Sequence, residues 1–234
     1  MLLVLTGVTA VSVALLAYVN ELTKGPIAEA NVKTLNEALK QVLPEFTNNP
    51  VAEGDTVFSE KDGKKVVDFI IYPAKNGEKW IGSAVEAKAM GFSGELKVLV
   101  GFDVEGKIYN YALLSHSETP GLGSKAATWF KPQKREKSLI EKIFGFEMAS
   151  APRKSNIIGM SPQDTQLKVS KDGGQVDAIT ASTITSRAFL NAVNDAYQAY
   201  KGSAGETNAT SGASRKNKPA TAPESENVIN VTVN

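Results

Sequence analysis

The sequence predicts an α+β fold, with one mainly antiparallel sheet and flanking helices, preceded by a single N-terminal transmembrane helix. Three observations indicate this fold: an uncharged apolar run at the start, several strand-like runs joined by tight turns, and one strongly amphipathic segment near residue 195. The length of 234 residues suffices for one well-buried domain with an anchor and a tail. We expect an anchor at 1–22, a ligand-binding domain at 23–201 and a disordered tail at 202–234.

The N-terminal run comprises residues 2–19 and carries no charge. As a helix it would rise about 27 Å, close to the roughly 30 Å of a bilayer hydrocarbon core. Tyr18, Glu21 and Lys24 would then lie at the interface, where aromatic and charged anchors belong. A cleaved signal peptide is the alternative, but it usually has a shorter apolar core and a small-x-small cleavage site. We therefore favour an uncleaved anchor.

The next elements follow from periodicity. Apolar residues recur at helical spacing over 32–43 and stop at Pro44, which predicts an amphipathic helix. β-branched and aromatic runs then predict strands, at 66–72, 80–87, 96–102 and 108–114. The turn at 103–106 joins the last two as a hairpin. In the third strand, Leu96, Val98, Val100 and Phe102 should share one face.

The C-terminal part contains a loop rich in Gly and Pro, then a helical stretch at about 134–144. The segments 167–170 and 175–179 suggest a second hairpin around 172–174. The last helix has one continuous apolar face, formed by Phe189, Leu190, Val193, Ala196, Tyr197 and Tyr200. From Gly202 onward core-forming residues almost disappear, which predicts disorder.

Composition excludes several functions. Lys and Arg total 26 against 25 Asp and Glu, so no whole-chain field recruits nucleic acid, and we expect no nucleic-acid partner. A local run of Lys131, Lys134, Arg135 and Lys137 indicates a solvated helix face rather than a lipid-headgroup contact. There is no Cys and only one His, which excludes iron–sulfur clusters, thiolate zinc sites, c-type haem and H-E-x-x-H hydrolases. We expect no metal site, so electron transfer would need an organic cofactor.

Residues 177–186 read D-A-I-T-A-S-T-I-T-S and lie between a predicted strand and the start of the last helix. A helix start offers unpaired backbone N–H groups and a positive dipole end, which suit a phosphate. The hydroxyls could bond that phosphate or be esterified by it. Simple capping by Ser and Thr is the commoner explanation on these grounds alone.

Residues 116–123 read H-S-E-T-P-G-L-G and directly follow a predicted strand. Gly121 and Gly123 around Leu122 let the backbone approach a flat ligand closely, and His116, Glu118 and Thr119 add polar groups beside it. A tight surface loop is an equally good explanation.

Taken in this order, the two motifs resemble the FMN-binding domain found in the G-type subunit of the Rnf electron-transport complex and in the C-type subunit of the sodium-translocating NADH:quinone reductase. The resemblance covers roughly residues 27–200. It implies FMN joined through its phosphate to Thr183 by a separate flavin transferase that uses FAD. Asp177 matches the acidic residue that opens the transferase pattern. Ala181 stands where the family has Gly and Ser182 where it has Ala, so Ser182 is a rival acceptor.

The resemblance also implies the cofactor-binding residues. One group lies near Thr183: Thr180, Ser182, Ile184 and Thr185. The other lies against the isoalloxazine ring: Glu118, Thr119, Leu122 and Gly123. We expect backbone N–H groups near Leu122 and Gly123 to bond the ring.

The expected protein is thus a covalent FMN electron carrier in an ion-translocating oxidoreductase complex of the ferredoxin:NAD type. It is a redox subunit without catalytic residues of its own and is not a complete enzyme. Its partners would be the other membrane subunits and the transferase. We expect a single-pass protein of the bacterial inner membrane, with the flavin domain on the periplasmic side.

Other interpretations remain open at this point. Membership of the sodium-translocating quinone reductase is the nearest. A serine hydrolase would need a nucleophile motif, and neither G-x-S-x-G nor S-x-x-K occurs. A non-catalytic envelope adaptor would leave both motifs unused. Residues 101–107 match the start of a P-loop, but Ile108 follows where Ser or Thr should bind magnesium, so a hairpin turn explains them.

Overall fold

The computed structural model describes residues 1–61, 64–132, 154–163 and 166–209. Its centre is one antiparallel sheet in which each strand pairs with the next along the chain. The strands are β1 (Asp55–Lys61), β2 (Lys64–Asn76), β3 (Lys79–Met90), β4 (Glu95–Asp103) and β5 (Ile108–Ser115). The predicted α+β class with an antiparallel sheet is confirmed.

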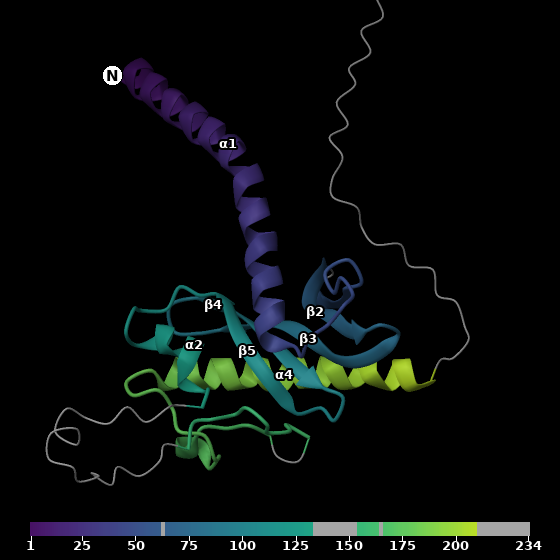
Figure 1. Cartoon of the computed structure of the whole chain (residues 1–234). Helices are drawn as coiled ribbons and strands as arrows, with labels where there is room; N and C mark the ends of the chain where they lie inside the picture. The colour runs from purple at the N-terminus through teal and green to yellow at the C-terminus, as the bar shows by residue number, and fades with distance from the viewer. Residues whose placement is uncertain (62–63, 133–153, 164–165, 210–234) are drawn as a thin grey trace, which may run out of the picture.

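Two long helices lie on opposite faces of this sheet (Figure 1). Helix α1 (Leu2–Val42) rises from one face, and α4 (Thr183–Ala209) runs across the other. Short elements lie between β5 and α4: η1 (Gly123–Lys125), α2 (Ala126–Trp129) and η2 (Ser170–Asp172). The described part of the domain therefore has three layers, helix, sheet and helix.

Helix α1 is continuous, although the sequence suggested an anchor and a separate second helix. Pro26 lies inside it, and Figure 1 shows the helix bending partway along. Proline lacks an N–H and crowds the carbonyl four residues earlier, so it bends a helix without always ending it. Within the described residues, α1 is the one helix long and apolar enough to cross a membrane.

The C-terminal end of α1 docks on the sheet. Leu39, Val42 and Leu43 are buried against residues of β2, β3 and β4, including Leu99. Gly101 of β4 makes this docking possible, because a Cβ there would overlap the carbonyl group of Val42. The sheet and the last turns of α1 thus form one packed unit.

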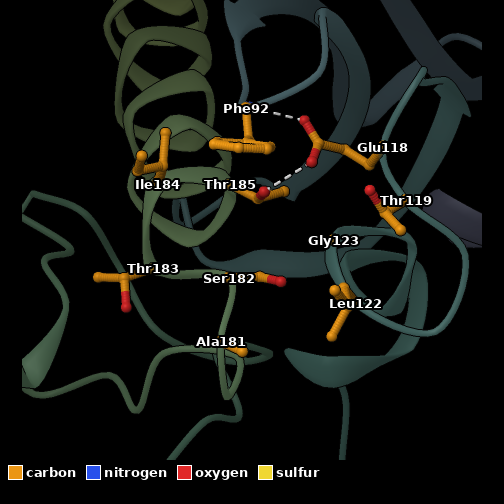
Figure 2. A pocket seen from close by; sticks show the side chains of 10 residues that line it. All are labelled: Phe92, Glu118, Thr119, Leu122, Gly123, Ala181, Ser182, Thr183, Ile184 and Thr185. Carbon is orange, nitrogen blue, oxygen red and sulfur yellow. Dashed lines mark hydrogen bonds between the residues drawn. The ribbon is translucent and has the colours of Figure 1, made fainter.

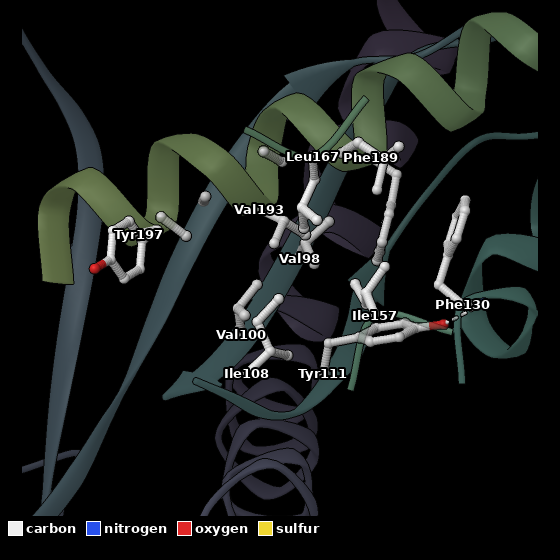
Figure 3. Close-up of a cluster of buried hydrophobic side chains, with 14 of the residues drawn as sticks. Val98, Val100, Ile108, Tyr111, Phe130, Ile157, Leu167, Phe189, Val193 and Tyr197 are labelled. Carbon is white, nitrogen blue, oxygen red and sulfur yellow. Dashed lines mark hydrogen bonds between the residues drawn. The ribbon is translucent and has the colours of Figure 1, made fainter. Parts of the chain in front are cut away.

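The opposite face of the sheet carries the main core, shown in Figure 3. Leu96, Val98, Val100 and Phe102 of β4 all belong to this core, as their alternation predicts. The facing side chains of α4 recur at helical spacing, and they include Phe189, Leu190, Val193, Ala196, Tyr197 and Tyr200. Each large apolar side chain buried here contributes roughly 1.5–3 kcal/mol. Burial of these side chains sets how α4 lies across the sheet and therefore where its first residues are placed.

Two strand predictions were incomplete or wrong. Strand β1 was not expected; it lies at one edge of the sheet, and Val57 and Phe58 on it are exposed. The second hairpin is wrong, because its segments meet only at a single parallel bridge between Val169 and Val176. The side-chain amide of Asn194 on α4 explains this, since it pairs with both the N–H and the C=O of Leu167, at 3.0 and 2.9 Å. These groups would otherwise bond a strand.

Several other expectations fall at the limits of the described residues. The predicted helix at 134–144 lies outside them, as do Lys134, Arg135 and Lys137. Lys131 is described, and its ammonium lies 4.9 Å from the centre of the Tyr111 ring. Helix α4 runs past residue 201 to Ala209, into the segment predicted to be disordered, and the remainder of that segment lies outside the described residues.

Candidate functional site

The loop after β5 is a tight turn over residues 119–122. The carbonyl of Thr119 accepts the N–H of Leu122 at 3.1 Å, and Gly121 in the third position has a φ of 75°. Pro followed by a residue with positive φ is the pattern of a type II turn. The N–H of Leu122 is therefore used within the turn. Of the two N–H groups expected to bond the ring, only that of Gly123 has no partner among the described residues.

The loop is anchored by Tyr111 on β5. The Tyr111 hydroxyl donates to the carbonyl of Ala126 at 2.9 Å and accepts the N–H of Phe130 at 3.1 Å. Burial raises the pKa of Tyr111, so the hydroxyl stays protonated and can donate. The turn at 119–122 is thus held at a fixed place beside the sheet.

A second turn of the same kind, over residues 179–182, leads into α4. The N–H of Ser182 donates to the carbonyl of Ile179 at 3.0 Å, and Ala181 in the third position has a φ of 62°. The buried hydroxyl of Ser186 fixes this turn: it accepts the N–H of Ile179 and donates to the carbonyl of Ser182, both at 2.9 Å. Sequence reasoning gave Ser186 no role.

The backbone at Ala181 leads to a stability prediction. Ala181 holds its side chain in the left-handed region, which costs about 1 kcal/mol. We expect Ala181→Gly to raise the free energy of unfolding by about 0.5–1 kcal/mol, after allowance for the greater flexibility of unfolded Gly. Urea unfolding of the full-length protein measures this difference. Gly at the exposed neighbour, Thr180→Gly, should instead destabilise the chain; equal effects of the two changes would contradict the strain.

Glu118 connects three segments of the site. Its side chain is 5% exposed. Oε1 accepts the backbone N–H groups of Phe92 and Ser93, at 2.7 and 3.1 Å, and Oε2 accepts the Thr185 hydroxyl at 2.8 Å (Figure 2). Gly123 leaves room for this carboxylate, since a Cβ there would overlap it. Glu118 therefore ties the β3–β4 loop, the β5 loop and the start of α4 together.

These three segments enclose a cavity of about 320 Å³. It is lined by Phe92, Glu118, Thr119, Leu122, Gly123, Ala181, Ser182, Thr183, Ile184 and Thr185. All the predicted site residues except Thr180 line it. Thr180 lines a separate hollow on the other side of the turn, with Trp129 and Asp177. The structure thus brings the two sequence motifs to one cavity, although about sixty residues separate them.

Phe92 is the residue that sequence reasoning missed. It lies between Gly91 and Gly94 in the turn joining β3 to β4, and the residue is 69% exposed. An aromatic residue between two glycines at a strand end was the available signal. Together with the half-exposed side chains of Leu122 and Ile184, it gives the cavity an apolar rim.

The orientation of the hydroxyls differs along the second turn. In Figure 2, the Ser182 hydroxyl points toward Leu122, whereas the Thr183 side chain points to the other side of the chain. Ser182 accepts the first helical bond of α4 through its carbonyl, from the N–H of Ser186 at 3.0 Å, and so holds the cap position. Its hydroxyl makes no capping hydrogen bond with the described residues, so simple capping does not explain this serine.

Residues 91–198 match the FMN-binding domain family. The G-type subunit of the ion-translocating oxidoreductase complex of Aliivibrio fischeri is 34% identical over 203 residues, which cover 85% of this chain and 88% of the relative. The corresponding protein of Shewanella amazonensis is 31% identical over 195 residues, 82% and 83% of the two chains. The G-type subunit of the Na⁺-translocating ferredoxin:NAD⁺ oxidoreductase complex of Acetobacterium woodii is 30% identical over 205 residues, 85% and 89%.

The chain belongs to the family of Rnf G-type subunits. As a member with an FMN-binding domain, it should offer a place for a phosphate and one for a flat ring. The described residues fit both: unpaired N–H groups at the start of α4 suit the phosphate, and the apolar rim suits the ring. The cavity volume lies within the usual range for ligand sites.

In this Rnf-family chain, Asp177 and Arg187 make hydrogen bonds that hold the segments around the site. Asp177 accepts the N–H of Lys154 at 2.9 Å and the Ser170 hydroxyl at 3.2 Å. Near the start of α4, the Arg187 guanidinium bonds both carboxylate oxygens of Asp172, at 2.7 and 2.6 Å, and holds the pKa of Asp172 below its usual range. His116 is exposed and does not line the cavity.

Proposed function

We propose that this chain is a membrane-anchored electron carrier that holds FMN through a phosphoester bond to Thr183. It acts as the redox subunit of an ion-translocating oxidoreductase complex of the ferredoxin:NAD type. One observation carries the proposal: the start of α4, with its hydroxyl residues, faces the turn at 119–122 across a single cavity.

Thr183 suits the role of acceptor. It is the first residue of α4 and is half-buried, and its hydroxyl makes no hydrogen bond with the described residues. In the transfer, the Thr183 oxygen forms a bond to the phosphorus of the FMN half of FAD. The pyrophosphate P–O bond breaks, AMP leaves, and a base of the transferase takes the hydroxyl proton. No group is oxidised or reduced in this step.

When bound, FMN supplies the electron-accepting and electron-donating chemistry. The residues of the chain position it. The N–H groups of the first turn of α4 orient the phosphate, while Phe92, Leu122 and Ile184 exclude water from the ring. Glu118 holds these segments in place relative to one another through its three hydrogen bonds.

Helix α1 is proposed as the membrane anchor, with the flavin domain on the periplasmic side of the inner membrane. Residues 2–19 are uncharged and exposed in the isolated chain, as a lipid-facing segment would be. Because the same helix docks on the sheet through Leu39 and Val42, the domain would be held close to the membrane and to the other membrane subunits. The relatives carry the names of ion-translocating and ferredoxin:NAD⁺ oxidoreductase complexes, which favours the Rnf type over the quinone reductase.

Flavin attachment tests this function directly. The full-length protein should be produced with and without an active flavin transferase, then denatured and analysed by intact mass and flavin fluorescence. We expect one FMN adduct that resists denaturation, and only when the transferase is present. Bare protein under both conditions would refute the carrier role; labelling by a serine-reactive probe would then indicate a hydrolase, and no labelling an adaptor.

A further inference from the structure

Ser182 is a largely buried residue whose hydroxyl makes no hydrogen bond with the described residues. Ser182 is 8% exposed. Its backbone N–H and C=O are both bonded, to Ile179 and Ser186 respectively, so the main chain at this residue is fixed. Its hydroxyl makes no hydrogen bond with the described residues and points into the cavity toward Leu122 (Figure 2).

Within the described residues, no other hydroxyl on the cavity wall belongs to a largely buried residue, lacks a hydrogen-bond partner and points toward Leu122. The Thr185 hydroxyl donates to Glu118 at 2.8 Å. Thr119 is exposed, and the Thr183 side chain points to the other side of the chain from Leu122. The backbone bonds of Ser182 hold the turn without this hydroxyl.

We propose that the Ser182 hydroxyl donates a hydrogen bond to an acceptor atom on the ring system of the bound flavin. This inference rests on the proposed function and concerns a contact particular to this chain. The orientation selects the ring rather than the phosphate: the hydroxyl points toward Leu122 and the apolar rim, away from the Thr183 oxygen that would carry the phosphate.

The proposed bond has a defined effect on the midpoint potential. Reduction adds negative charge to the ring, and a donor aimed at that charge stabilises the reduced form more than the oxidised form. Ser182 therefore raises the midpoint potential of the flavin relative to a chain with Ala at this position.

The test uses full-length protein flavinylated by the transferase, with the midpoint potential measured by spectroelectrochemical titration. Ser182→Ala should keep the adduct on Thr183, shown by peptide mass mapping, and should have a more negative potential than the parent. Ser182→Gly, which a helix cap tolerates, removes the same hydroxyl and should shift the potential in the same direction. The matched control is Ser83→Ala, which removes a buried hydroxyl on β3 bonded to Trp80, away from the cavity, and should leave the potential unchanged.

The possible failures are distinguishable. An unchanged or raised potential with the adduct still on Thr183 overturns the hydrogen bond and leaves the proposed function intact. Loss of the adduct in Ser182→Ala together with its retention in Thr183→Ala overturns both, because Ser182 would then be the attachment residue.

Discussion

Thr183→Ala is expected to abolish covalent flavin attachment while the domain stays folded. The substitution removes the only oxygen to which the proposed ester is made. The hydroxyl makes no hydrogen bond with the described residues, so we expect the free energy of unfolding to change by less than about 1 kcal/mol. Intact mass after co-production with the transferase measures attachment, and urea unfolding measures stability.

Thr183→Ser is the matched control, because it keeps an oxygen at the same place on α4 and should retain at least part of the adduct. An adduct still present on Thr183→Ala would contradict the assignment. Peptide mapping would then decide between Ser182 and Thr185. The hydroxyl of Thr185 is buried and bonded to Glu118, so Ser182 would be the first candidate.

Much of the fold was predictable because its signals are local. The alternation in β4 and the apolar stripe of α4 correspond to one buried face each, and both predictions are confirmed. The failed hairpin at 167–179 had suitable local sequence as well. It failed because Asn194, on an element distant in sequence, takes the backbone groups of Leu167. Such competition has no local signature.

The site likewise has features with a local sequence signal and features that depend on residues distant in sequence. Both motifs were found in the sequence, since glycines, hydroxyls and a following helix are readable there. That they meet in one cavity with Phe92 depends on Glu118, whose three hydrogen bonds join segments far apart in the chain. Thr180 lines a separate hollow, and its neighbour Ala181 has a positive φ that an alanine in the sequence does not predict.

The second large effect is expected from Glu118, whose carboxylate holds the site together. Glu118→Ala would leave the backbone N–H groups of Phe92 and Ser93 and the buried hydroxyl of Thr185 without their acceptor. Hydrogen bonds to a charged group contribute about 1.5–3 kcal/mol each, with partial replacement by water reducing the sum. We expect a loss of about 3 kcal/mol in the free energy of unfolding, measured by urea titration of the full-length protein. Trp80 and Trp129 both lie in the domain and report its unfolding by fluorescence.

Glu118→Gln separates the hydrogen bonds from the charge. One amide oxygen can still accept the N–H groups of Phe92 and Ser93, while the NH₂ can donate to the Thr185 oxygen, so the loss should fall to about 1 kcal/mol. In a double-mutant cycle, Thr185→Val and Glu118→Ala should be non-additive by about 1 kcal/mol, because both remove the same 2.8 Å bond. Flavin should stay attached in every variant, since the ester on Thr183 does not involve Glu118. If Glu118→Ala costs less than about 1 kcal/mol, or the two changes add independently, this carboxylate does not join the three segments, and the cavity must owe its shape to other contacts.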